Sequence, residues 1–404
     1  MKRILKKITV FSFIFSVCVF GKIFAVPFFS GYSGGKLNYS INPQTDENIS
    51  NLKLQAFFAG QFNLNENNWI HLEFSIDTQN LISEDFFTAT PSLFQIDELS
   101  FTKRFQGIDI NNYCSAFMGT YDPIGSDVFL QRYFSIQSIT SKLTDSYLGL
   151  AGSILYPHFG LGVSDVVKLN QYPLAFGGYL YLNHEDTNAF VLNSDLRAAC
   201  VYRFFTCDLA LGLGLPVKTA NQDDYIIAVE RLYWHLGTTI LIGNNYTNSL
   251  FIQGGLFNAT FQGKKEFIVK NEDIYILFEP RFIVENFHIN ISFYSLPPKT
   301  IKKMLFIDDS LGFNANFYSD SVKIKSKVFT IGTHLSFSFP DKSIADLSDK
   351  KLLQSPYNIN LTPYVSTDFL GGELHAQANF RLMEFVNKKN GNIFSIDIGY
   401  RTKF

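Results

Sequence analysis

Charged side chains of opposite sign recur two residues apart in several stretches of this sequence. Asp195 and Arg197 form one such pair, and Glu279 and Arg281 form another. In an extended strand, residues i and i+2 point to the same side, so each pair shares one face. Such a face has two uses. The charges either line a water-filled channel and act on passing solutes, or they form ion-pair ladders that only solvate an interior wall.

One further pair joins a base to a hydroxyl, namely His334 and Ser336. A shared strand face brings the two side chains toward hydrogen-bond distance, as nucleophilic catalysis requires. The spacing resembles the His-x-Ser of barrel-type lipid hydrolases, but Phe337 and Ser338 replace the Asn-Gly that follows the Ser in that family. Such pairs arise often by chance, so we expect no enzyme. The seven His are scattered singly, without metal-ligand spacing, and no phosphate-binding Gly loop occurs, so no metal and no cofactor are expected.

The pairs lie in stretches of about ten residues that alternate apolar and polar side chains, the weak signature of barrel strands. The last stretch places aromatic and aliphatic residues on one face up to the chain end: Phe394, Ile396, Ile398, Tyr400, Thr402 and Phe404. About nineteen stretches of this kind can be found, whereas a barrel with both ends on one side needs an even number. We expect about 18 strands, with about 16 or 20 as neighbours, and place the surplus in the Gly-rich region 146–183.

The N-terminal region has the layout of a secretory signal peptide over residues 1–25. Lys2, Arg3, Lys6 and Lys7 precede an apolar run, and Ala25 ends a tolerable cleavage site. Removing the five basic residues of this region from the total of 34 leaves 29 against 36 acidic residues, which argues against a nucleic-acid partner. No later run is long and apolar enough for a membrane helix. Residues 26–404 then form a single domain.

A terminal strand that ends on an in-phase aromatic, behind a signal peptide, resembles the closing strand of bacterial outer-membrane β-barrels. The resemblance implies an all-β, antiparallel, up-and-down transmembrane β-barrel in the outer membrane, with Tyr400 and Phe404 read by the barrel assembly machinery. Thr402 departs from the family pattern, where an apolar residue is more common. A soluble β-sandwich or propeller also alternates, but the signal peptide, the 16% of aromatic residues and the terminal Phe favour the barrel.

The same resemblance implies a porin-like channel that passes small solutes through a polar lumen, with the outer face of the barrel in contact with outer-membrane lipid. It leaves open whether copies assemble into a homo-oligomer. The alternatives are a transporter of hydrophobic substrates and a non-conducting adhesin. The charged faces of the predicted strands would line the pore: Lys53, Glu73, Asp77, Asp195, Arg197, Glu279, Arg281, Glu373, Arg381 and Arg401. Arg203, His375, Asp397 and Lys403 share these faces. Mixed signs argue against strong ion selectivity.

Residues 122–145 form the longest stretch without clean alternation and are too aromatic for disorder. In position and length the stretch resembles the inward-folded constriction loop of general porins. Asp127 and Arg132 would then narrow the lumen. The alternative is an ordinary surface loop packed on its own aromatic side chains.

Three cysteines follow the signal region, too few for a disulfide framework. A two-residue hairpin turn at Arg203 and Phe204 would set Cys200 directly opposite Cys207. The pair then either closes a disulfide or remains as two reduced cysteines on an apolar face.

Overall fold

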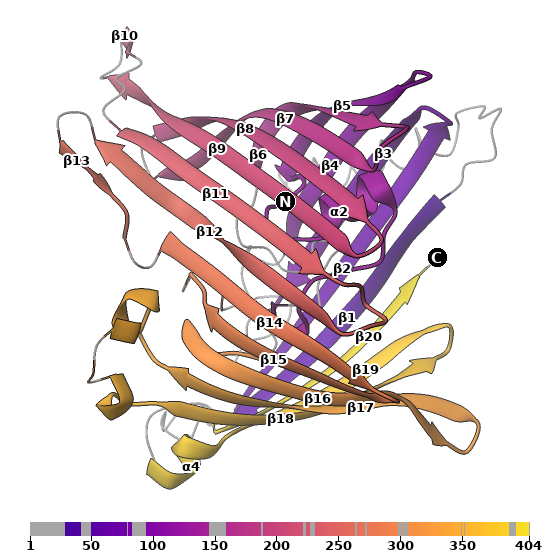
Figure 1. Cartoon of the computed structure of the whole chain (residues 1–404), viewed down its shortest axis with the longest axis vertical. Helices are drawn as coiled ribbons and strands as arrows, with labels where there is room; N and C mark the ends of the chain where they lie inside the picture. Colours follow the sequence, from indigo (N-terminus) through magenta and orange to yellow (C-terminus); the bar gives the residue numbers. More distant parts are fainter. Residues whose placement is uncertain are drawn as a thin grey trace.

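Long antiparallel strands make up most of the described chain, as Figure 1 shows. This computed structural model describes residues 29–403 except 42–49, 79, 83–93, 145–158, 187–188, 221–223, 227–230, 263–264, 271–272, 298–300, 302–305, 349, 351 and 388–392. The strands are β1 (Phe29–Ile41), β2 (Ser50–Asn65), β3 (Asn68–Asp77), β4 (Phe94–Gln106), β5 (Ile110–Thr120), β6 (Phe159–Leu169), β7 (Leu174–Asp186), β8 (Ala189–Tyr202), β9 (Phe205–Ala220), β10 (Asp224–Ile226), β11 (Arg231–Ile242), β12 (Ser249–Gln262), β13 (Lys265–Ile268), β14 (Ile274–Val284), β15 (Phe287–Ser295), β16 (Leu311–Ile324), β17 (Lys327–Phe339), β18 (Asn358–Phe369), β19 (Gly372–Arg381) and β20 (Phe394–Lys403). The helices are α2 (Val128–Phe134) and α4 (Leu382–Asn387), and the 3-10 turns are η1 (Lys142–Thr144), η3 (Ile344–Ser348) and η4 (Leu352–Gln354).

The sheet closes on itself through its first and last strands. β1 pairs with β2 on one side and with β20 on the other, from Tyr32 opposite Lys403 to Ile41 opposite Phe394. The short strands β10 and β13 pair with β9 and β12 and only extend the wall, so the closed barrel has 18 strands. Within the described residues, each of the 18 wall strands is paired with a neighbour on both sides, which protects the sheet edges. The predicted up-and-down antiparallel barrel is confirmed.

Each of the 18 wall strands overlaps one of the stretches expected from the sequence. The surplus stretch, residues 146–156, falls outside the described residues, as does the expected signal peptide, residues 1–25. One expected strand end is wrong. β19 stops at Arg381, and Leu382 begins α4 instead of continuing the strand.

The two faces of the wall differ sharply in character. On β8, Leu196 is 65% exposed on the outside, whereas its neighbours Asp195 and Arg197 are 1% and 3% exposed on the inside. On β6, Leu161 and Val163 likewise stand on the outer face with large exposed fractions. An apolar outer surface around a polar interior is the arrangement of a barrel whose solvent is lipid. None of the helices among the described residues is long and apolar enough to cross a membrane.

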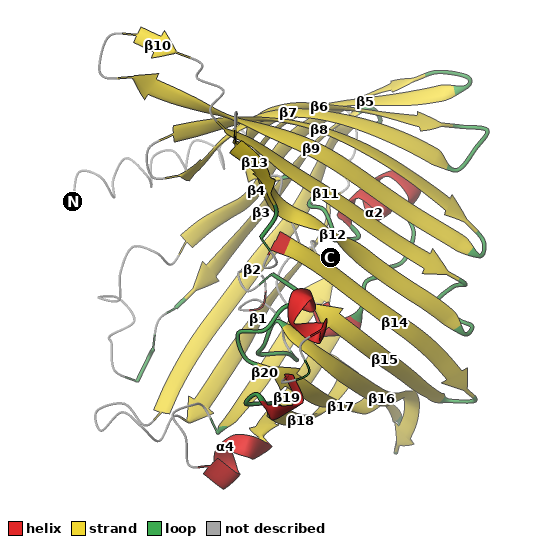
Figure 2. Cartoon of the chain, turned by 60° about the vertical axis from the view of Figure 1, so that its left-hand side comes forward, coloured by secondary structure: helices red, strands yellow, loops and turns green. Residues whose placement is uncertain are grey.

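Connections of two lengths lie at opposite ends of the barrel, as Figure 2 shows. The end at which β1 begins and β20 stops has tight turns, such as 66–67, 203–204, 285–286, 325–326 and 370–371. The other end has most of the long connections, including 121–158 and 340–357. One connection there is short, because β7 ends at Asp186 and β8 begins at Ala189.

Candidate functional site in the barrel lumen

Residues 121–144, here called the inward segment, leave β5 and fold into the barrel. Helix α2 of this segment lies inside the wall in both views (Figures 1 and 2). Phe129, Leu130 and Leu143 are buried in one apolar cluster with wall residues that include Phe251 and Leu277. Segment and wall therefore share the core of the protein. The expectation of an inward-folded stretch matches this placement, and the alternative of a surface loop does not.

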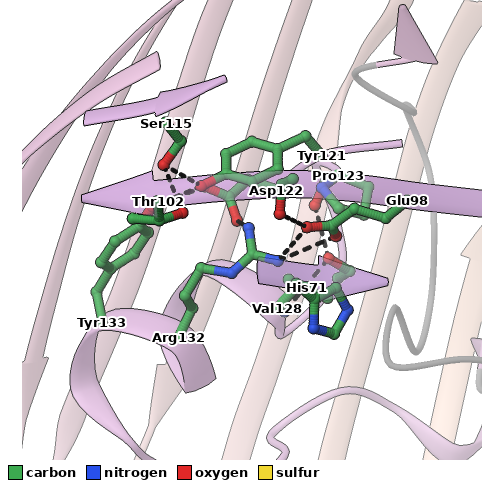
Figure 3. A network of polar contacts seen from close by, with 12 residues as sticks. His71, Glu98, Thr102, Ser115, Tyr121, Asp122, Pro123, Val128, Arg132 and Tyr133 are labelled. Atoms are coloured by element: carbon green, nitrogen blue, oxygen red, sulfur yellow. Dashed lines mark hydrogen bonds and ion pairs between the residues drawn. The ribbon is translucent and has the colours of Figure 1, made fainter. Parts of the chain in front are cut away.

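Arg132 ties α2 to the wall and to the start of the inward segment. Its Nη2 donates to both carboxylate oxygens of Glu98 on β4, at 2.8 and 3.0 Å, and its Nη1 donates to Asp122 at 2.6 Å. The guanidinium also stacks 4.4 Å from the ring centroid of Tyr121 (Figure 3). Burial alone would lower the pKa of Arg132, but the two carboxylates outweigh it and hold that pKa well above its usual value. Arg132 is therefore a permanently charged anchor.

Asp127 lies within the inward segment and does not face an open lumen. One oxygen of its carboxylate accepts the backbone N–H groups of Ile139 and Thr140, at 2.9 and 2.8 Å, together with the hydroxyls of Ser138 and Thr140. Burial raises the pKa of Asp127 against the opposing effect of these hydrogen bonds. Asp127 was expected to narrow the lumen. In the structure its carboxylate has another role, because it holds residues 138–140 of the inward segment against the start of α2.

Arg197 on β8 forms the second anchor of the inward segment. Its Nε donates to Asp208 on β9 at 2.8 Å and its Nη2 donates to the other oxygen of the same carboxylate at 2.5 Å. Nη1 donates to the backbone carbonyl of Asp122, and the guanidinium lies 4.5 Å from the ring centroid of Phe129. The side chain of Arg197 is fully buried. Arg197 was expected to face channel water, and the segment that covers it is the reason it does not.

Asp195, two residues earlier on β8, is enclosed in the same way. Its carboxylate accepts the Tyr181 hydroxyl at 2.9 Å and lies 2.9 Å from His235 Nε2 on β11. A side chain at Gly212 would collide with this pair, because its Cβ would stand 1.9 Å from the imidazole and 2.1 Å from the carboxylate. Glycine at this place on β9 therefore permits the contact across the strand.

Glu279 and Arg281 on β14 hold the far end of the inward segment. Arg281 Nε donates to Glu279 at 2.8 Å, and its Nη2 donates to the carbonyl of Ile139 at 2.9 Å. Glu279 also accepts the hydroxyls of Ser141 and Ser292. This charge pair was expected on the lumen side and lies there, but both side chains form hydrogen bonds with the inward segment.

A second stretch, residues 306–310, covers another part of the wall. The ring of Phe306 stacks on His334 of β17 at 3.8 Å between centroids. Asp308 forms an ion pair with Arg381 of β19 at 2.6 Å, and Asp309 accepts the Ser338 hydroxyl at 2.6 Å. Arg381 is therefore partly covered, though it keeps some exposure.

His334 and Ser336 do not form a nucleophile–base pair. Nδ1 of His334 lies 2.9 Å from Asn314 Oδ1, and Nδ2 of the same Asn314 donates to the Ser336 hydroxyl at 2.6 Å. Ser336 in turn donates toward the carbonyl of Phe306. The shared face predicted from the spacing is present, but both side chains are used in packing the second stretch.

The inward-facing charges that meet most water stand on strands near the β1–β20 seam. Lys53 on β2 and Asp77 on β3 are exposed. Glu373 and Arg401 form an ion pair at 2.7 Å, with side chains 36% and 41% exposed. Both signs of charge are present along this part of the wall.

Two further polar residues add to this seam. Asn38 of β1 donates to Asp397 of β20 at 2.8 Å, and Lys36 lies 3.7 Å from the same carboxylate. Sequence analysis placed Asp397 on the inner face but did not single out Lys36, because β1 is rich in glycine and its alternation is weak. Of the other charges, Arg203 lies in a turn, and the side chain of Lys403 is outside the described part.

Tyr400, one of the two residues expected to direct assembly, lies at the end with the tight turns. Tyr400 donates its hydroxyl to the carbonyl of Leu370 at 3.1 Å, which joins β20 to the β18–β19 turn. Phe404 lies outside the described residues.

One cluster within the described residues has the composition of a metal site. Atoms of His71, Glu73 and Glu98 all lie within 4.8 Å of one another, and all three residues are buried. Sequence analysis missed it, because the third member comes from a different strand. The available signal was the His-x-Glu spacing on β3, which puts both side chains on the inner face.

The cysteine register is confirmed. Cys200 pairs directly with Cys207 across the predicted two-residue turn at 203–204, and both are free thiols in the structure.

Comparison with known proteins agrees with this fold. No protein-family description matches the sequence, and no curated protein matches it. Among solved structures, OccAB3 of Acinetobacter baumannii superposes with a TM-score of 0.52 at 10% identity, covering 93% of this chain and 99% of that one. A mutant porin of Rhodobacter blastica gives a TM-score of 0.41 at 7% identity, with 94% and 100% covered. The likeness to OccAB3 extends over almost the whole barrel and supports the fold.

Proposed function

We propose that this protein is a porin-like channel of the bacterial outer membrane that passes small solutes through a polar lumen. The observation that carries the proposal is the division of the wall into an apolar outer face and a charged inner face, on a closed barrel of 18 strands. Only a barrel or a helix satisfies every backbone group in lipid, and this wall has no open edge.

The proposed path runs beside the β1–β20 seam. Hydrogen bonds join the inward segment to β4, β5, β7, β8, β12 and β14 and to the turn at 243–248, and the second stretch to β17, β18 and β19. The more exposed charges, Lys53, Asp77, Glu373 and Arg401, stand on β2, β3, β19 and β20. Because these charges have mixed signs, we expect weak ion selectivity and passage of small neutral solutes as well.

The alternatives have less support. A transporter of hydrophobic substrates needs an apolar lumen, whereas the inner wall holds buried Asn, Ser and Thr side chains such as Asn314, Ser336 and Thr362. The pair that the sequence offered for catalysis, His334 and Ser336, is engaged by Asn314 through both side chains. An adhesin with a sealed lumen differs from a channel in one measurable property, the flux of solutes.

Liposome swelling tests the proposal. Purified, refolded protein in liposomes should admit small sugars at rates that fall steeply with solute size. Empty liposomes and liposomes with heat-denatured protein serve as controls. Liposomes that contain folded barrel, shown by its heat-modifiable migration in SDS gels, and that stay closed to the smallest sugar would contradict the channel.

Assembly is the second part of the proposal. Tyr400 lies in the closing strand β20 and Phe404 follows it in the sequence, and we propose that the barrel assembly machinery reads both. Deletion of Phe404 should lower the amount of heat-modifiable barrel in outer-membrane fractions. The control is the Lys403→Gln variant, which keeps Phe404. Equal assembly of the deletion variant and the control would exclude this signal.

A further inference from the structure

A histidine and two carboxylates converge on the inner wall beside the base of the inward segment. His71 and Glu73 lie two residues apart on β3, so both point into the barrel. Glu98 of β4 stands directly opposite Glu73 in the strand register. The three residues are 5%, 7% and 4% exposed, and their ligand atoms lie within 4.8 Å of one another. Three elements of the fold, β3, β4 and α2, meet at this place (Figure 3).

The electrostatics of the cluster favour a cation. Like charges directly opposed across two strands destabilise a sheet, and burial increases the cost. Glu73 and Glu98 are such a pair, and Asp122 adds a third carboxylate on the other side of Arg132. Arg132 is the guanidinium that joins Glu98 to Asp122. A positive ion between Glu73 and Glu98 would offset their mutual repulsion directly.

The imidazole supplies the second, independent observation. Nε2 of His71 is buried and makes no hydrogen bond in the part of the chain that the structure describes. It points toward the carboxylates, at 3.9 Å from Glu73 Oε2. A buried ring nitrogen without a hydrogen bond carries a desolvation cost, which a metal–nitrogen bond would remove.

We propose that His71, Glu73 and Glu98 bind a divalent first-row transition-metal ion, such as Zn²⁺. One imidazole nitrogen with two carboxylate oxygens is a ligand set for this class, whereas Mg²⁺ and Ca²⁺ prefer oxygen ligands alone. Oε1 of Glu98 already accepts from Ser100 and Arg132, whereas Oε2 accepts only from Arg132 and keeps a lone pair for a metal ion. With an ion bound, Arg132 and Ser100 would be outer-shell partners that orient the Glu98 carboxylate. The ion would fasten the β3–β4 wall to the anchor of the inward segment.

Titration calorimetry with Zn²⁺ alone tests this site on refolded, detergent-solubilised protein. The wild type should bind one equivalent. His71→Ala and Glu73→Gln should each weaken binding at least about tenfold, since loss of outer-shell partners alone typically costs 10–100-fold. The matched control is His288→Ala, which removes another strand histidine beside a carboxylate, Asp320, at 3.4 Å. Heat-modifiable migration verifies that each variant is folded.

X-ray absorption of the Zn²⁺-loaded protein gives a second readout. It should show one imidazole nitrogen and otherwise oxygen ligands, at about 2.0–2.2 Å. Absence of stoichiometric binding to the folded wild type, or binding that only His288→Ala abolishes, would overturn the assignment. The site depends on the fold and not on conduction, so a barrel that conducts without binding Zn²⁺ refutes the site and leaves the channel intact. A barrel that binds Zn²⁺ without conducting does the reverse.

Discussion

Replacing Arg197 with methionine should destabilise the barrel. The substitution keeps an unbranched apolar stem but lacks the guanidinium, so it removes both hydrogen bonds to Asp208 and the one to the carbonyl of Asp122. Asp208, itself 5% exposed, would then be a buried carboxylate that has lost its bidentate partner. Breaking a buried ion pair from one side costs about 3–5 kcal/mol, and we expect a loss of unfolding free energy in this range.

A double-mutant cycle separates the orphaned charge from simple loss of packing. Asp208→Asn in the Arg197→Met background removes the unpaired charge, so the double variant should be more stable than the sum of the two single losses predicts, by about 1–3 kcal/mol. Urea-induced unfolding in lipid vesicles, followed by tryptophan fluorescence and by migration in SDS gels, measures all four proteins. An Arg197→Met barrel as stable as wild type, with strictly additive effects in the cycle, would mean that Arg197 faces water and that the inward segment is not anchored there.

Three further outcomes are expected. Lys53→Glu should shift the reversal potential toward cation preference, because Lys53 is an exposed inner-wall charge. The control Lys325→Glu, in the tight turn at 325–326, should shift it much less, and equal shifts would count against a path along the β1–β20 seam. Leu196→Arg should lower stability by about 2–4 kcal/mol if this outward residue lies near the bilayer midplane, and an unchanged urea midpoint would mean that β8 does not face lipid. Cys200 and Cys207 should remain free thiols in mass analysis without reductant. Directly opposed strand residues hold their Cβ atoms ~4.5–5.5 Å apart, which is wider than the mean of about 3.8 Å in disulfides. A mass lower by two hydrogens would show the disulfide instead.

Local alternation carries most of the information about this fold. Side-chain period two is fixed by strand geometry, so the faces of β8 and the opposition of Cys200 and Cys207 follow from spacing alone. The even strand number follows from having the first and last strand ends on the same side of the barrel. One further stretch that the alternation predicts, residues 146–156, lies outside the described residues and stays a prediction.

The interior could not be predicted in the same way. Whether Arg197 meets water depends on a segment more than 50 residues away that folds over it, and alternation carries no record of that contact. The cluster of His71, Glu73 and Glu98 depends equally on the register between β3 and β4, which contains an irregularity between Glu73 and Phe74. Sequence spacing assigns a side chain to the inside of a barrel. Only the inward-folded stretches decide which inside residues line a path and which are sealed in ion pairs.

The most direct test of the central claim is single-channel recording in planar lipid bilayers. Refolded, heat-modifiable protein should insert with discrete conductance steps, weak ion selectivity and a long-lived open state, because exposed charges of both signs line the wall near the β1–β20 seam. Reproducible insertion of the folded barrel, detected by protein in the membrane, without any conductance step would contradict the channel and favour a sealed barrel with a role at the cell surface.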